Sequence, residues 1–209
     1  MNFKHFFFRE IRQFCEEYAT KDYDVYFESP LFTGSYGGKI DNPAFNRIRV
    51  QSILDNDKFL ENIKIKNLEI NVFYDKTPND LHEYNFLDQN NEVLLCFAYM
   101  KMLNDNGMEN NSIWNSTETK GLYFTLFFDY FLPKTKYIRS SDNNTLQASR
   151  FWIKAVDFAL DKNYKCSLLN LSTKEEFFIK DKNYLKNHFE SVWGNTLHDI
   201  RIKIYNYEN

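Results

Sequence analysis

The stretch that decides the fold runs from residue 63 to residue 72 and reads Ile63-Lys64-Ile65-Lys66-Asn67-Leu68-Glu69-Ile70-Asn71-Val72. Its apolar and polar side chains alternate, as expected for β-structure with one face buried and the other in water. The alternation fits one long bent strand or two short strands. Strands of an all-parallel sheet are usually apolar on both faces, so the pattern favours an antiparallel or mixed sheet.

Other periodic segments lie on both sides of this stretch. Apolar side chains at helical spacing predict three helices, at residues 2–19, at residues 145–161 and at residues 182–193, the last with Asp181 as its N-cap and Gly194 after its end. Runs rich in aromatic and β-branched residues predict further strands at residues 23–28, 44–53, 121–132, 166–171, 176–179 and 200–206. Because residues 121–132 are the most strand-like of these runs, we expect them to form a central strand.

Three segments have weaker patterns. Residues 75–91 and 104–119 are polar and are predicted to be long connections. Residues 92–103 fit either a helix or a buried strand, and their helical propensity favours the helix.

These elements together predict an α+β fold in which about three packed helices cover an antiparallel or mixed sheet. The C-terminal half is predicted to follow the order β-α-β-β-α-β. With 209 residues, 43% of them apolar, the chain can bury one sizeable core. We therefore expect a single α+β domain over residues 1–209, with a soft division near residues 110–120 as the alternative.

Composition excludes several classes of protein. The chain has only 6 Gly and 4 Pro, which excludes collagen-like and low-complexity proteins. No apolar run approaches the roughly 20 residues that span a bilayer, and Arg9 and Glu10 interrupt the N-terminal stretch where a secretory signal would continue. The cysteines Cys15, Cys96 and Cys166 are odd in number and widely spaced, which predicts a reduced, cytoplasmic protein.

Local motifs for catalysis or metal binding are absent from the sequence. The histidines are His5, His82, His188 and His198, and no two of them have the helical spacing of a zinc site. The loop at residues 33–39 is rich in glycine, but its spacing differs from that of a nucleotide-binding P-loop. No serine lies in a nucleophile elbow or an acylation motif. We therefore assign no catalytic residue, no metal ligand and no cofactor, and favour a protein that is not an enzyme.

An enzyme with a site dispersed along the chain is the alternative hypothesis, either a transferase or a metal-dependent hydrolase. Such a site requires the loop at residues 34–39 to meet His188 or His198 in space.

Charge is unevenly distributed along the chain. Residues 1–119 hold 12 Lys and Arg against 19 Asp and Glu, whereas residues 120–209 hold 14 against 10. Residues 75–118 carry eight acids and only two lysines, which predicts an acidic, loop-borne edge that attracts a basic partner. The predicted partner-binding residues are Asp75, Asp80, Glu83, Asp88 and Glu92.

These observations predict a non-catalytic cytoplasmic module that binds another protein with a basic surface. The formal net charge of −3 disfavours binding to nucleic acid, unless basic residues of the C-terminal half form a local patch, namely Arg139, Arg150, Lys154, Arg201 and Lys203. A small, acidic, motif-poor α+β chain is similar in general character to the immunity proteins that neutralise bacterial toxins and to accessory proteins of phages and mobile elements. This similarity is one of composition, and it implies a basic toxin, such as a nuclease, as the partner.

Overall fold

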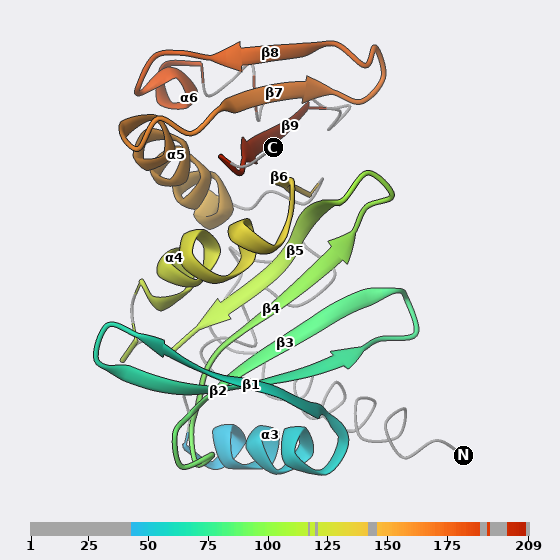
Figure 1. The fold of residues 1–209 in the computed structure, drawn as a ribbon, viewed down its shortest axis with the longest axis vertical. Coiled ribbons are helices and arrows are strands. Elements are labelled where there is room, and N and C mark those ends of the chain that lie inside the picture. Colours follow the sequence, from blue (N-terminus) through green and yellow to red (C-terminus); the bar gives the residue numbers. More distant parts are fainter. Residues whose placement is uncertain are drawn as a thin grey trace, which may run out of the picture.

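A computed structural model describes residues 43–116, 118–119, 121–141, 146–188, 192 and 200–207. The described part contains one nine-stranded sheet in the order β1-β2-β3-β4-β5-β6-β9-β7-β8 (Figure 1). The strands are β1 Lys58–Ile65, β2 Leu68–Lys76, β3 Leu81–Asp88, β4 Leu94–Met102, β5 Gly107–Asn115, β6 Tyr137–Ser140, β7 Cys166–Asn170, β8 Glu176–Ile179 and β9 Ile200–Tyr205. Strands β5 and β6 run parallel and the other neighbours antiparallel. The predicted α+β fold with a mixed sheet is therefore confirmed.

Helices pack on both faces of this sheet (Figure 1). They are α3 Pro43–Asn56, α4 Leu122–Leu126 with its π-helical continuation η1 Phe127–Phe131, the short 3-10 helix η2 Leu132–Lys134, α5 Leu146–Asp161 and α6 Tyr184–Asn187. Among the described helices, none is long and apolar enough to span a bilayer.

Two clusters of buried apolar side chains lie against opposite faces of the sheet. In the first cluster, Phe127 of η1 and residues of α5 pack with Ala98 and Met100 of β4. In the second cluster, Ile53 of α3 packs with Phe97 of the same strand. Since successive residues of a strand point to opposite faces, α3 covers one face of β4 and the segment from α4 to α5 covers the other.

The helix predicted for residues 92–103 is wrong, because this segment forms β4. Residues 94–100 are all buried, since helices cover both faces of the strand. A strand buried on both faces has no polar alternation, and its apolar density equals that of a buried helix. Propensity was therefore a poor guide at this position.

The central strand predicted for residues 121–132 is also wrong, because these residues form α4 and η1. Their aromatic side chains are buried between the sheet and α5. The ring of Phe127 lies 5.6 Å from that of Trp152 in α5 and 5.4 Å from that of Phe151. A helix enclosed on several sides is apolar all round, and such a run resembles a buried strand in sequence.

The strand predicted for residues 44–53 is instead part of α3. Pro43 is the first helical residue, a position that proline favours, and the buried residues Asn46, Val50 and Ile53 recur at helical spacing. The Asn46 side chain joins the helix to the sheet, since its Nδ2 donates to the Leu94 carbonyl (3.1 Å) and its Oδ1 accepts from the Leu94 N–H (2.9 Å). One amide thus satisfies both backbone groups at the start of β4.

The connections predicted for residues 75–91 and 104–119 contain β3 and β5. Both strands carry polar residues toward the interior, including Glu83, Asn85 and Glu109, each less than 10% exposed. Polar composition indicated loops, whereas these side chains are buried with hydrogen-bonding partners inside the protein.

Several predicted elements are confirmed. The alternating stretch forms two strands, β1 and β2, which pair as a hairpin. The helix predicted at residues 145–161 is α5, the predicted pair of strands at residues 166–171 and 176–179 is the β7–β8 hairpin, and the last predicted strand is β9.

The C-terminal half differs from the prediction in detail. Its described elements follow the order β6, α5, β7, β8, α6, β9, with β6 rather than residues 121–132 as the first strand. Asn183, and not Asp181, is the N-cap of α6. The predicted helix at residues 2–19, the strand at residues 23–28 and Gly194 lie outside the described residues.

Gly107 at the start of β5 allows a close approach of two strands. A Cβ atom at this position would lie 2.3 Å from Cζ of Tyr137 in β6, which is far inside contact distance. The Tyr137 hydroxyl is in turn 2.6 Å from Oδ2 of Asp105. The parallel pairing of β5 and β6 thus requires glycine where the tyrosine ring crosses the neighbouring strand.

We expect Gly107→Ala to lower the free energy of unfolding by about 1–3 kcal/mol, because the new methyl group must displace the Tyr137 ring. Urea denaturation would measure the change. In a Tyr137→Ala background the same substitution should cost clearly less, and an equal cost in both backgrounds would contradict this explanation.

Candidate functional site

Two of the predicted partner-binding acids, Asp75 and Asp80, lie near the turn between β2 and β3. Asp75 is half-buried near the end of β2, opposite Glu83 of β3. Asp80 is exposed, and its Oδ1 is 2.6 Å from Nζ of Lys76. The hydrogen bond and charge of Lys76 hold the pKa of Asp80 below its ordinary value. A local lysine therefore offsets part of the negative charge at this end of the hairpin.

Glu83 lies inside the protein. Its side chain is 5% exposed and forms an ion pair with Arg49 of α3. Asn85 Nδ2 also donates to Glu83 Oε1, at 2.8 Å. Glu83 therefore lies beneath α3 in the isolated chain and is not part of the exposed acidic surface. The sequence did not indicate this pair, because Arg49 was predicted on a strand and Glu83 in a loop.

The ion pair belongs to a larger polar cluster that joins α3 to β3. Asn85 Nδ2 also donates to Oδ2 of Asp57, at 2.8 Å. Burial, together with the negative charge of Glu83, raises the pKa of Asp57 to about 6. Groups with such pKa values occur in acid–base sites and in structural ion-pair networks. Here the contacts run from Arg49 to Glu83, from Glu83 to Asn85, and from Asn85 to Asp57. This is the arrangement of a structural network that attaches α3 to β3.

The other two predicted acids are Asp88, the last residue of β3, and Glu92, in the β3–β4 loop. Asp88 Oδ1 accepts hydrogen bonds from the backbone N–H groups of Glu92 and Val93, both at 2.7 Å. The Glu92 side chain is exposed. Strand β3 separates this loop from Asp80 by about 26 Å, at roughly 3.3 Å per residue. Apart from the buried Glu83, the predicted acids are thus divided between the two ends of β3.

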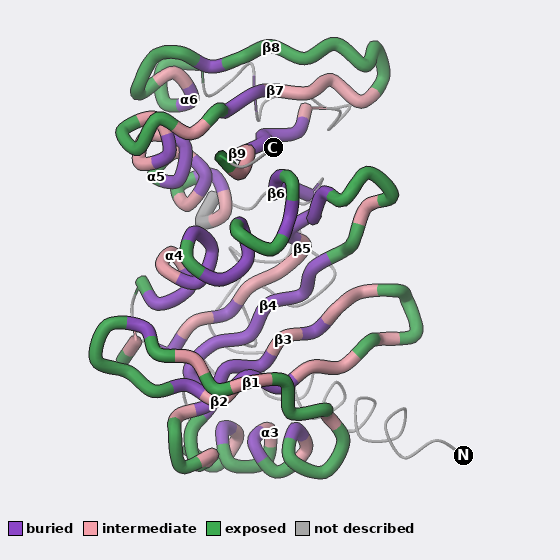
Figure 2. Tube along the Cα trace, viewed as in Figure 1, coloured by how far each residue is buried: buried purple, intermediate pink, exposed green. Residues whose placement is uncertain are grey.

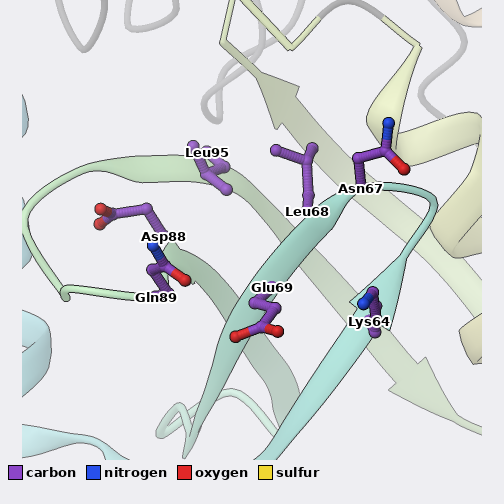
Figure 3. Close-up of a pocket in the computed structure, with 7 residues that line it drawn as sticks. All are labelled: Lys64, Asn67, Leu68, Glu69, Asp88, Gln89 and Leu95. Carbon is purple, nitrogen blue, oxygen red and sulfur yellow. The ribbon is translucent and has the colours of Figure 1, made fainter.

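A hollow of about 390 Å³ lies beside the β3–β4 loop. Figure 3 shows that its lining residues come from the β1–β2 hairpin, the end of β3 with the loop that follows it, and β4. Its wall combines apolar side chains with two carboxylates and one amine, and the residues are Lys64, Asn67, Leu68, Glu69, Asp88, Gln89 and Leu95. Glu69 is exposed and was not among the predicted site residues, although the alternation of residues 63–72 placed it on the wet face.

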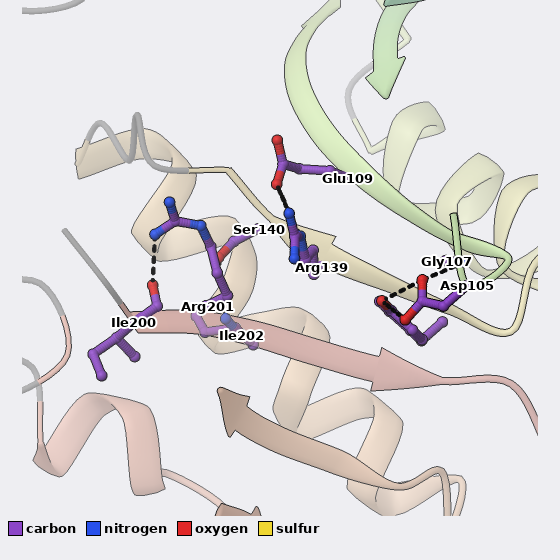
Figure 4. A network of polar contacts seen from close by, with 9 residues as sticks. Asp105, Gly107, Glu109, Arg139, Ser140, Ile200, Arg201 and Ile202 are labelled. Carbon is purple, nitrogen blue, oxygen red and sulfur yellow. Dashed lines mark hydrogen bonds and ion pairs between the residues drawn. The ribbon is translucent and has the colours of Figure 1, made fainter. Parts of the chain in front are cut away.

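A second polar network joins β5, β6 and β9 (Figure 4). Arg139 of β6 donates from Nε and Nη2 to Oε2 of Glu109, at 2.8 and 2.7 Å. In β9, the N–H of Ile202 donates to Oγ of Ser140 (3.1 Å). Lys203 of β9, 7% exposed, places its Nζ 4.0 Å from the centroid of the Tyr137 ring.

Three basic residues that the sequence predicted in an alternative nucleic-acid-binding patch lie in this region: Arg139, Arg201 and Lys203. Arg139 is paired with Glu109, and Arg201 and Lys203 are buried. Their positive charges are therefore largely withdrawn from the surface.

The described histidines lie in separate places. His82 Nδ1 is 2.9 Å from the hydroxyl of Tyr74, and burial lowers the pKa of His82. His188 is exposed and stacks on Tyr184, with ring centroids 4.1 Å apart. His5, His198 and the loop at residues 34–39 lie outside the described residues. A dispersed enzymatic site built from that loop and a histidine stays a prediction.

Metal-ligating and thiol groups are sparse in the part of the chain that the structure describes. Within it, no group of three or more His, Cys, Asp or Glu side chains is placed to hold a metal ion. Cys96 and Cys166 are buried free thiols, and burial raises the pKa of Cys166 to about 12. Cys15 lies outside the described residues.

Comparison with protein-family models, curated proteins and solved structures finds no match. The function must therefore be argued from the described side chains.

Removal of Arg49 should leave the Glu83 charge buried without its cation. We expect Arg49→Met to lower the free energy of unfolding by about 3 kcal/mol at neutral pH, measured by urea denaturation. The double variant Arg49→Met, Glu83→Met should recover part of the loss, since no buried charge remains. A double variant less stable than Arg49→Met would contradict the ion-pair assignment.

The raised pKa of Asp57 predicts a pH-dependent cost of folding. Below about pH 4 the carboxyl is neutral in the folded state, whereas above its folded pKa of about 6 the buried charge destabilises the fold. Relative to the wild type, Asp57→Asn should therefore gain about 1 kcal/mol in unfolding free energy between pH 4 and pH 7.5, after allowance for solvent screening. Asp55→Asn, on the exposed side of α3, is the matched control, and an equal gain in that variant would refute the prediction.

Proposed function

We propose that this chain is a non-catalytic protein-binding module that holds a basic segment of another protein at the hollow beside the β3–β4 loop. The observation that carries the proposal is that one hollow is lined both by two acidic residues, Glu69 and Asp88, and by two leucines, Leu68 and Leu95. Glu92 extends the negative charge along the adjacent loop. Two of the acids predicted from the sequence therefore belong to the proposed surface.

Charge favours a cationic ligand at this site. Glu69 and Glu92 are exposed, so their fields reach into solvent and attract positive charge over about a Debye length. Lys64 is the one base that lines the hollow. Encounter with a basic partner should therefore be faster at low salt.

The apolar part of the hollow favours an amphipathic cation over a small ion. Leu68 is 41% exposed and Val93, next to Glu92, is 39% exposed. Arginine and lysine bury their aliphatic stems on apolar surface while the charged end meets carboxylates. Arginine in addition donates two parallel hydrogen bonds to one carboxylate. An arginine side chain flanked by apolar residues is the ligand that suits these walls.

A basic toxin is the partner class that this chemistry fits, and the chain would then act as an immunity or accessory protein in the cytoplasm. An acidic surface that occupies the phosphate-binding face of a nuclease would block its substrate. Support for this narrower assignment comes from the negative charge of the hollow and the loop, and from the composition of the chain.

The double variant Glu69→Lys, Glu92→Lys tests the proposal. Titration with a hexa-arginine peptide at low salt should show about tenfold weaker binding than to the wild type, because two attractive charges become repulsive. The control Asp129→Lys, Asp161→Lys makes the same change in net charge at exposed sites in η1 and α5, and should bind within about twofold of the wild type. Equal losses in the two double variants would refute the site.

The same proteins, used as baits in an extract of the native host, test the partner class. A basic protein retained by the wild type and by the control, but lost by the Glu69→Lys, Glu92→Lys variant, would support the proposal. Failure to retain any such protein at low salt would overturn it.

A further inference from the structure

Among the described strands, β8 forms one edge of the sheet. It follows β7 at the end of the strand order, and Figure 2 shows it as almost wholly exposed. Its two central side chains, Phe177 and Phe178, are 55% and 48% exposed. A free edge presents unpaired backbone N–H and C=O groups to other strands, and exposed aromatic residues add apolar area to such an edge.

The opposite edge, β1, is interrupted by an irregularity, whereas β8 is not. The register of β1 shifts between Phe59 and Glu61, which indicates a bulge. Bulges are a common protection of edge strands. The register of β8 against β7 is unbroken along all four paired positions. Of the two edges of the described sheet, β8 therefore has the more regular backbone for pairing.

The hydrogen bonds of the β7–β8 hairpin show which backbone groups of β8 face outward. The N–H of Asn170 donates to the carbonyl of Glu175 at 2.9 Å, so Glu175 faces β7. Residues along an antiparallel strand alternate between facing the partner and facing away. The backbone N–H and C=O groups of Phe177 and Ile179 therefore point toward β7. Those of Glu176, Phe178 and Lys180 point away from it.

We propose that two copies of this chain associate through β8, antiparallel about a two-fold axis that passes beside Phe178. Each copy would add a strand to the sheet of the other, which is the β-augmentation mode of recognition in an isologous, closed dimer. This association is independent of the hollow beside the β3–β4 loop, from which β8 is separated by most of the sheet.

Charge complementarity selects this register. A two-fold axis at Phe178 pairs the outward groups of Phe178 with those of Phe178 in the second copy, and pairs Glu176 with Lys180 twice by symmetry. Within its own chain, Oε1 of Glu176 accepts hydrogen bonds from the hydroxyls of Ser167 and Tyr205 and lies 3.2 Å from Nζ of Lys203, so Lys180 of the second copy would meet the other oxygen, Oε2. An axis at Glu176 would place two glutamates opposite each other, and an axis at Lys180 would place two lysines opposite each other. Opposite charges across a strand pair stabilise it and like charges destabilise it.

Side chains on the two faces also match in this register. On one face the two exposed Phe178 rings lie side by side across the axis, and on the other face Phe177 lies opposite Ile179 of the second copy. Aromatic and aromatic–aliphatic cross-strand pairs are among the favourable ones. An axis at Phe177 would instead place Glu176 opposite Phe178, without a charge pair.

Sedimentation equilibrium over a series of concentrations tests the association. The weight-average mass of the wild type should rise from 25.2 kDa toward twice that value. Lys180→Glu should weaken association by about tenfold or more, because two attractive pairs become repulsive. Lys165→Glu, which changes an exposed lysine just before β7, is the matched control and should associate like the wild type. A wild type that stays monomeric throughout, or equal losses in the two variants, would overturn the proposal.

Phe178→Pro tests the proposed dimer interface with a variant whose own fold should be kept. Proline at this position removes an N–H that faces away from β7, so the hairpin keeps its own hydrogen bonds. We expect a folded protein by circular dichroism that remains monomeric at concentrations where the wild type associates. Association of this variant with unchanged strength would show that β8 is not the interface, and would refute the proposal.

Discussion

Burial of β4 on both faces is the constraint on which the rest of the structure depends. Residues 94–100 have no exposed side chain, so each face of this strand needs a cover. The segment from α4 to α5 supplies an apolar cover on one face. On the other face α3 is polar along much of its length, and it is fastened by Asn46 to the backbone of β4 and by Arg49 to Glu83. The buried Arg49–Glu83 pair is thus a consequence of covering the second face of β4 with a polar helix.

The sequence predicted those elements in which one face is wet. Strands β1 and β2 show alternation, and α5 shows an apolar stripe, because water contacts one side of each. Strand β9 also alternates in sequence, but its polar side chains Arg201 and Lys203 are buried. Prediction failed where an element lies wholly inside. In β4, and in α4 with η1, the apolar run indicates that the segment is buried but does not distinguish a strand from a helix. In β3 and β5 the polar residues face inward to partners that the local sequence does not reveal.

The sign of the charge at the candidate site was predictable from the sequence, but the shape of the site was not. The excess of acids in residues 75–118 indicated where negative charge gathers along the chain. Pairing with distant residues then decided which charges reach solvent, since Arg49 covers Glu83 while Glu92 stays exposed. Glu69 lies before that acidic segment, and the antiparallel pairing of β2 with β3, in which Ile70 lies opposite Asp88, brings it close to Asp88. A hollow of this kind comes from tertiary contacts between segments that each look unremarkable in sequence.

The position of β9 has a consequence for biosynthesis. This strand, which includes residue 205, lies between β6 and β7, although both of those strands are made earlier. During translation the hairpin β7–β8 emerges from the ribosome before the strand that links it to the rest of the sheet. The first five strands can form a nascent meander while this hairpin waits, exposed to chaperones and proteases, until β9 leaves the exit tunnel and joins the two parts.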